Sequence, residues 1–117
     1  MSNPNVEAWT QENARYTDGR AEQAVVCCWT GTGASIAANK VGGVRAALCV
    51  DAATADGARR WNDSNVLALS LRSTSEAELV EILDAWFAGQ PSGEEEDRAN
   101  VAHVIAIDDA PDDQSDA

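Results

Sequence analysis

Three short apolar runs alternate with segments of helical pattern, and this alternation limits the possible folds more than any other feature. The runs are Gln23–Cys28, Val44–Val50 and Asn65–Ser70. Their length and their β-branched residues favour buried strands. Strands joined through helices make right-handed crossovers and a parallel sheet. The sequence therefore predicts an α/β fold of the doubly wound, Rossmann-like kind, a three-layer sandwich with helices on both faces of a parallel sheet.

Helices are predicted before, between and after these strands. Asp51 has the side chain of an N-cap, and Ser75 and Glu78 have the spacing of a capping box. The expected helices are Pro4–Gly19, Ala34–Val41, Asp51–Arg60, one that begins at Thr74 or Ser75, and one from about Glu94 to Ile107. In the fourth helix, apolar residues at helical spacing predict one stripe: Leu79, Ile82, Leu83, Trp86 and Phe87. We expect one domain over residues 1–107 and a disordered acidic tail over residues 108–117.

The strongly acidic composition argues against a nucleic-acid partner. The net charge is −12, from 20 acidic and 8 basic residues. Such a chain repels phosphate backbones, so we expect no nucleic-acid partner. A high-salt cytoplasm and a GC-rich genome would both produce this bias, and composition leaves the two origins open.

Targeting signals and disulfides are not predicted. No apolar run approaches the roughly 20 residues that span a bilayer, so we expect no membrane partner. The first residues do not follow the pattern of a secretory signal. The three cysteines, Cys27, Cys28 and Cys49, cannot all pair, and we interpret them as reduced thiols of a cytoplasmic protein.

A glycine loop, Trp29-Thr-Gly-Thr-Gly33, lies between the first strand and the next helix. Backbone N–H groups at such a helix N-terminus attract a phosphate or a developing oxyanion. The spacing fits neither a dinucleotide-binding fingerprint nor a P-loop, and a tight turn is the alternative reading. Cys28 stands directly before the loop, where a thiol can ionise and act as a base. From the residues alone, a buried core cysteine is the stronger interpretation.

A resemblance to a known family changes that balance. The run Cys28-Trp-Thr-Gly-Thr-Gly-Ala-Ser-Ile-Ala-Ala-Asn-Lys40 is followed in order by Gly43-Val-Arg-Ala-Ala-Leu-Cys49, Asn62-Asp-Ser-Asn-Val-Leu-Ala-Leu69 and Glu81-Ile-Leu-Asp-Ala-Trp86. Together these segments resemble the ribose-5-phosphate isomerase B and galactose-6-phosphate isomerase family. The likeness is strong over residues 21–89 and weak in the flanks.

The resemblance implies aldose–ketose interconversion of a phosphorylated sugar, such as ribose 5-phosphate, through a cis-enediolate, with no cofactor and no metal. Cys28 matches the base, and Thr30 matches a catalytic hydroxyl in the loop. The residues that match substrate-binding positions are Trp29, Gly31, Thr32, Gly33, Asn62, Arg72 and Arg98. The two arginines match phosphate contacts, and Arg98 would reach into the active site of another subunit.

Several departures from the family pattern keep alternatives open. Trp61 occupies the place of a ring-opening histidine, and Trp29 occupies the place of a glycine. The sole histidine, His103, is expected on the surface or at an interface rather than in catalysis. The acidic run Glu94–Asp97 replaces basic residues, which weakens the expected phosphate affinity.

The family's first strand, which ends in an Asp-His pair, has no counterpart in this sequence. Without it, Gln23–Cys28 is expected to be an edge strand, which invites pairing. A misplaced start, a second polypeptide that supplies the strand, and a decayed paralogue are the competing explanations. We therefore expect a homodimer or a hetero-oligomer, and a non-catalytic partner or sugar-binding subunit is the alternative to an isomerase.

Overall fold

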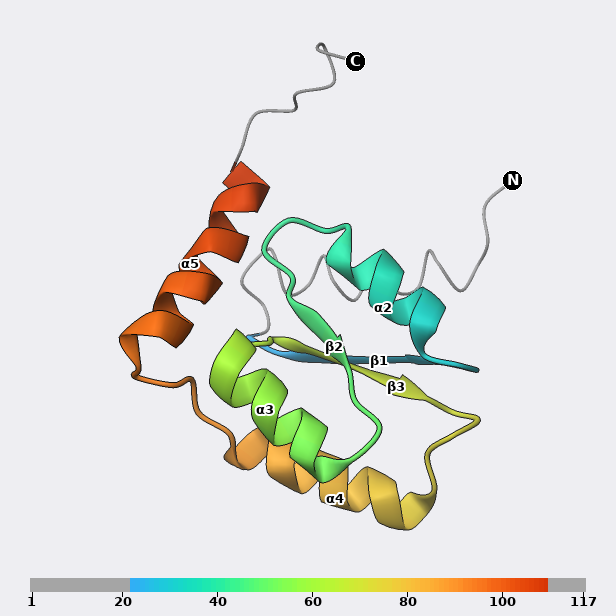
Figure 1. The fold of residues 1–117 in the computed structure, drawn as a ribbon. Coiled ribbons are helices and arrows are strands. Elements are labelled where there is room, and N and C mark those ends of the chain that lie inside the picture. Colours follow the sequence, from blue (N-terminus) through green and yellow to red (C-terminus); the bar gives the residue numbers. More distant parts are fainter. Residues whose placement is uncertain (1–21, 110–117) are drawn as a thin grey trace, which may run out of the picture.

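The computed structural model describes residues 22–109 and confirms the predicted α/β class. This part of the chain contains a parallel sheet of three strands with the order β1-β3-β2. The elements, in chain order, are β1 (Ala24–Cys28), α2 (Thr32–Asn39), β2 (Ala46–Leu48), α3 (Ala52–Asn62), β3 (Val66–Ser70), α4 (Glu76–Ala88) and α5 (Glu95–Asp109). Figure 1 shows α2 on one face of the sheet and α3 and α4 on the other.

The central strand β3 divides the core into two layers. Its side chains alternate between the faces, as the pleat requires. Val66 and Ala68 pack on the side of α2, whereas Leu67 and Leu69 pack on the side of α3 and α4. All five residues of β3 are buried, which explains why its sequence is a continuous apolar run.

The predicted helix signals are confirmed, with shifted ends. The Asp51 side chain caps α3 by accepting from the amide of Thr54, and Ser75 and Glu78 form the capping box of α4. Ile82 and Trp86 of the predicted stripe are buried, but Phe87 is 63% exposed and its inclusion was wrong. The predicted helix Pro4–Gly19 lies outside the described residues.

A buried arginine joins α3 to α4. Arg59 is 8% exposed, and its guanidinium lies 5.4 Å from the ring centroid of Trp86. It donates a hydrogen bond to the carbonyl of Ser64 and forms an ion pair with Asp63. A Cβ at Gly89 would lie 2.6 Å from the Cβ of Arg59, so the chain passes this side chain only because residue 89 is glycine.

Helix α5 is attached loosely and lies beside the amino ends of β1 and β3 (Figure 1). None of its residues is buried, and it packs mainly against α3. Near its end, the Asp108 carboxylate accepts a hydrogen bond from the amide of Gly43 at 2.9 Å. The helix continues to Asp109, so it includes the first two residues of the predicted tail, and residues 110–117 lie outside the described part. None of the helices in residues 22–109 is long and apolar enough to cross a membrane.

Candidate active site

The predicted base and the predicted glycine loop lie together at the carboxyl end of β1. The amide of Gly31 donates a hydrogen bond to the Cys28 sulfur at 3.2 Å. Gly31 has a φ of +80°, and a Cβ there would lie 3.0 Å from backbone atoms of Leu69 and Ser70. Both the left-handed conformation and this close approach require glycine. The loop is therefore held against the end of the sheet with its amides turned toward the thiol.

The loop changes the acidity of the thiol. Burial is the largest single influence and raises the pKa of Cys28, but the backbone amides of Ala34, Gly31, Thr30 and Gly33 together lower that pKa below its usual value. Amide hydrogen bonds favour the thiolate over the thiol. A cysteine that ionises more readily next to a set of N–H donors combines a proton acceptor with an anion-binding cradle.

The turn after β3 carries Arg72 to the same edge. The amide of Leu71 donates to the carbonyl of Cys28, and the amide of Arg72 donates to the carbonyl of Trp29, both at 2.9 Å. Thr30 and Thr32 share a hydroxyl–hydroxyl hydrogen bond of 2.9 Å within the loop. Seven of the nine predicted site residues are thus gathered at one edge: Cys28, Trp29, Thr30, Gly31, Thr32, Gly33 and Arg72.

The other two predicted site residues, Asn62 and Arg98, lie at the opposite edge. Asn62 ends α3 just before β3 begins, so it lies at the amino ends of the strands. Trp61 and Arg98 line one cavity of about 210 Å³ there, and Trp61 and Asn62 line a neighbouring groove. The length of β3 alone separates the two edges by ~13 Å. One chain therefore does not bring Asn62 or Arg98 to Cys28.

The Trp61 indole is 55% exposed and lies against its own helix. It lies over Gly57, one turn earlier in α3, where a Cβ would come within 2.8 Å of the ring. Trp61 also forms part of the walls of four hollows on this side of the molecule. The indole is thus an exposed apolar surface at the amino ends of the strands.

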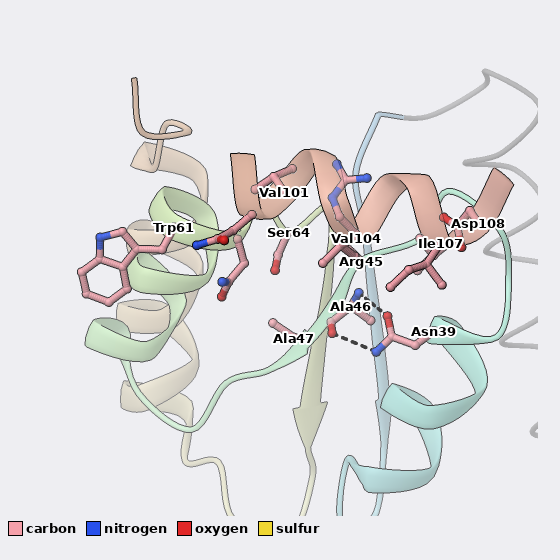
Figure 2. A pocket seen from close by; sticks show the side chains of 13 residues that line it. Asn39, Arg45, Ala46, Ala47, Trp61, Ser64, Val101, Val104, Ile107 and Asp108 are labelled. Carbon is pink, nitrogen blue, oxygen red and sulfur yellow. Dashed lines mark hydrogen bonds between the residues drawn. The ribbon is translucent and has the colours of Figure 1, made fainter. Parts of the chain in front are cut away.

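A groove of about 460 Å³ separates α5 from the edge of the sheet, away from the Cys28 loop. Figure 2 shows Val101, Val104 and Ile107 above it and Asn39 below. The Asn39 amide donates to the carbonyl of Ala46 at 3.0 Å, and its oxygen accepts from the amide of Ala46 at 2.8 Å. Asn39, part of the run that carried the resemblance, therefore has a structural role that its place in the sequence did not reveal.

The remaining cysteines and the histidine do not join the site. Cys49 is fully buried, and burial, followed by the charge of Asp51, raises the pKa of its thiol to about 11. Cys27 is exposed on the face of β1 opposite to Cys28. His103 is exposed on α5, as predicted. Within residues 22–109, no group of three or more His, Cys, Asp or Glu residues could hold a metal ion.

Comparison with known proteins gives this geometry a context. Residues 8–104 match the Ribose/Galactose Isomerase family. The D-erythrulose-4-phosphate isomerase of Pectobacterium atrosepticum is 40% identical over 76 residues, which are 65% of this chain and 50% of that protein. Ribose-5-phosphate isomerase B of Escherichia coli is 40% identical over 75 residues, which are 64% of this chain and 50% of that protein.

A solved structure extends the likeness. The ribose-5-phosphate isomerase B of Clostridium thermocellum superposes with a TM-score of 0.86 at 31% identity, over 93% of this chain and 73% of that one. The chain spans about half the length of the curated relatives it matches. The matched family region covers most of the sequence, including β1, the glycine loop and the strands that hold it. The chain belongs to the Ribose/Galactose Isomerase family.

Proposed function

We propose that the protein is an aldose–ketose isomerase of sugar phosphates in which Cys28 moves the proton. The observation that carries this proposal is the Cys28 thiol, its pKa lowered by loop amides, at the carboxyl end of a strand in an α/β sheet. In such sheets, ligands bind at the carboxyl ends of the strands. Membership of the isomerase family and the names of the relatives support the same class of substrate.

The proposed reaction needs one base and one anion cradle. The Cys28 thiolate removes the proton from C2 of an open-chain aldose, and the C2–H electron pair forms the C1–C2 double bond of an enediolate. The amides of Gly31 and Gly33 stabilise the negative oxygen at C1. A proton passes between the two oxygens with the help of the Thr30 hydroxyl, and the Cys28 thiol returns its proton to C1. C1 is reduced, C2 is oxidised, and nothing is consumed.

The phosphate is assigned to the arginines. Arg72 lies at the edge that carries Cys28, so its guanidinium is the contact that the same chain can supply. Asn62 and Arg98 lie at the other edge, so we propose that they complete the site of a neighbouring subunit. Arginine suits this task because its planar fork binds phosphate oxygens in pairs. The working form is then an oligomer rather than a single chain.

The lateral side of the sheet, along β1, offers a second contact between chains. Among the described residues β1 pairs with β3 alone, and its other side is an edge. We propose that a strand from a homodimer partner, or from a different chain in a hetero-oligomer, pairs there. The apolar edge of a sheet favours association.

The test is exchange of the C2 proton. Purified protein is incubated with ribose 5-phosphate, and separately with erythrose 4-phosphate, in deuterium oxide, and deuterium at C2 is followed by NMR. We expect exchange with at least one substrate, loss of exchange in Cys28→Ala, and most of the exchange retained in Cys27→Ala and Cys49→Ala. A fully active Cys28→Ala protein refutes the proposed base.

A non-catalytic partner or sugar-binding subunit is the second candidate. The exposed Trp61 indole favours it, because an aromatic surface can stack against a sugar but cannot donate a proton to the ring oxygen. Titration calorimetry with the same sugar phosphates separates the two candidates. Binding without any C2 exchange supports the subunit, and exchange that requires Cys28 supports the isomerase.

A further inference from the structure

Ser70, the last residue of β3, is buried beside the glycine loop, and nothing so far assigns it a role. It is 4% exposed and stands directly opposite Cys28 in the parallel register of β1 and β3. Its hydroxyl donates to the carbonyl of Trp29 at 3.1 Å and accepts from the amide of Ser73 at 3.1 Å. One hydroxyl thus connects the loop that surrounds the thiol with the turn that carries Arg72.

The carbonyl of Trp29 is fixed from two sides. The Ser70 hydroxyl and the amide of Arg72 both donate to this one oxygen. A trans peptide is planar, so its C=O and the following N–H point in opposite directions within one plane. Holding the Trp29 oxygen against the turn therefore aims the N–H of Thr30 away from the turn. The next amide, that of Gly31, donates to the Cys28 sulfur at 3.2 Å, and the Thr30 amide contributes to the lowered pKa of that thiol.

We propose that the Ser70 hydroxyl is a positioning group, which holds the Trp29–Thr30 peptide so that its N–H faces the Cys28 sulfur. Without the hydroxyl, the Trp29 oxygen keeps one donor, the amide of Arg72, and the peptide gains freedom to rotate. The thiolate then loses part of its hydrogen bonding, and the anion cradle loses a fixed donor. The catalytic consequence rests on the proposed isomerase function, whereas the orientation of the peptide does not.

The experiment measures the reactivity of the Cys28 thiol directly. In a Cys27→Ala background, the rate of iodoacetamide alkylation of the tryptic peptide 21–40 is measured by mass spectrometry as a function of pH. Ser70→Ala is expected to move the alkylation midpoint to higher pH and to slow alkylation near neutral pH by roughly 3- to 10-fold, the effect of losing about one hydrogen bond. Ser64→Ala, which deletes another buried serine hydroxyl at the far edge of the sheet, is the matched control and should leave the midpoint unchanged.

A second pair of variants isolates the hydroxyl should Ser70→Ala fold poorly. Ser70→Thr keeps the hydroxyl and adds a methyl group. Ser70→Val has the shape of that threonine, with a methyl group in place of the hydroxyl. We expect the parent midpoint in the threonine variant and the shifted midpoint in the valine variant. Folded Ala and Val variants with the parent midpoint overturn the inference.

The isomerase assay gives an independent readout. If the proposed function holds, the acid limb of the kcat/KM profile moves to higher pH in Ser70→Ala together with the alkylation midpoint. A merely structural role would lower the amount of folded enzyme without moving that limb. If the parent protein converts no sugar phosphate, the proposed function fails, yet the alkylation profiles still decide whether Ser70 positions the loop.

Discussion

Replacement of Gly31 by alanine tests whether the loop is held in place by its close approach to the sheet. Two costs combine at this residue. The left-handed φ of +80° costs an L-residue about 1–2 kcal/mol. The new Cβ would also lie 2.5 Å from the Cδ1 of Leu48 and 3.0 Å from backbone atoms of Leu69 and Ser70. The leucine can turn away, but the backbone of the central strand cannot.

The expected loss of unfolding free energy follows from these two costs. Overpacking in a rigid site costs about 1–3 kcal/mol, so Gly31→Ala should destabilise the protein by about 2–5 kcal/mol. The chain supplies two controls. Gly43→Ala meets a φ of +85° but no atom within 4 Å, so it should lose only about 1–2 kcal/mol. Gly42→Ala meets neither a positive φ nor a neighbour and should change little.

Urea unfolding followed by tryptophan fluorescence measures all three variants. The order of loss should be Gly31→Ala, then Gly43→Ala, then Gly42→Ala. Equal losses for Gly31→Ala and Gly43→Ala would show that the contact with β3 carries no cost, and the explanation of the loop geometry would then be wrong. Where Gly31→Ala stays folded, its Cys28 alkylation profile should also move to higher pH, because the displaced amide of Gly31 no longer reaches the sulfur.

Three further predictions follow from the packing and the charges. Gly89→Ala should lower the unfolding free energy by about 1–3 kcal/mol, because the new Cβ overlaps the buried Arg59. The melting temperature measures this loss, and an unchanged melting temperature would mean that the contact between Gly89 and Arg59 is not tight. Burial raises the pKa of Cys49 to about 11, so as pH rises its thiol ionises in the unfolded state before it does in the folded state. The unfolding free energy should therefore fall as pH rises from about 9 toward 11. Urea unfolding at several pH values should show this loss in the parent protein and not in Cys49→Ala. With a net charge of −12, the melting temperature should rise with potassium chloride from low to molar concentration, and a flat or falling curve would favour genome composition over salt adaptation.

The sequence was sufficient for the architecture because its strands and helix starts carry local signals. The run Asn65–Ser70 is apolar throughout because β3 is covered on both faces, and Ser75 with Glu78 forms the capping box that its spacing predicts. Phe87 was misjudged because it neighbours Trp86 on α4. Adjacent residues differ by about 100° around a helix, and only Trp86 turns toward the sheet.

The candidate site was predictable only in part. Cys28 and its loop are contiguous in the sequence, so their association required only that a helix follow the strand. Asn62 comes from another segment, and its separation from Cys28 follows from strand direction: Cys28 ends one parallel strand, whereas Asn62 precedes another. The hydroxyl of Ser70 and the amide of Asn39 act through contacts between distant segments, which no local pattern announces.

The side chain of Asn39 has a consequence for how far the sheet can grow. At the first residue of the outer strand β2, its amide occupies both the N–H and the C=O of Ala46, as a neighbouring strand would. A sheet that accepts strands at both margins can add molecules without limit and form fibres, whereas one that accepts them at a single margin stops after one addition. By imitating a strand on the β2 side, Asn39 hinders the addition of a further strand at that margin.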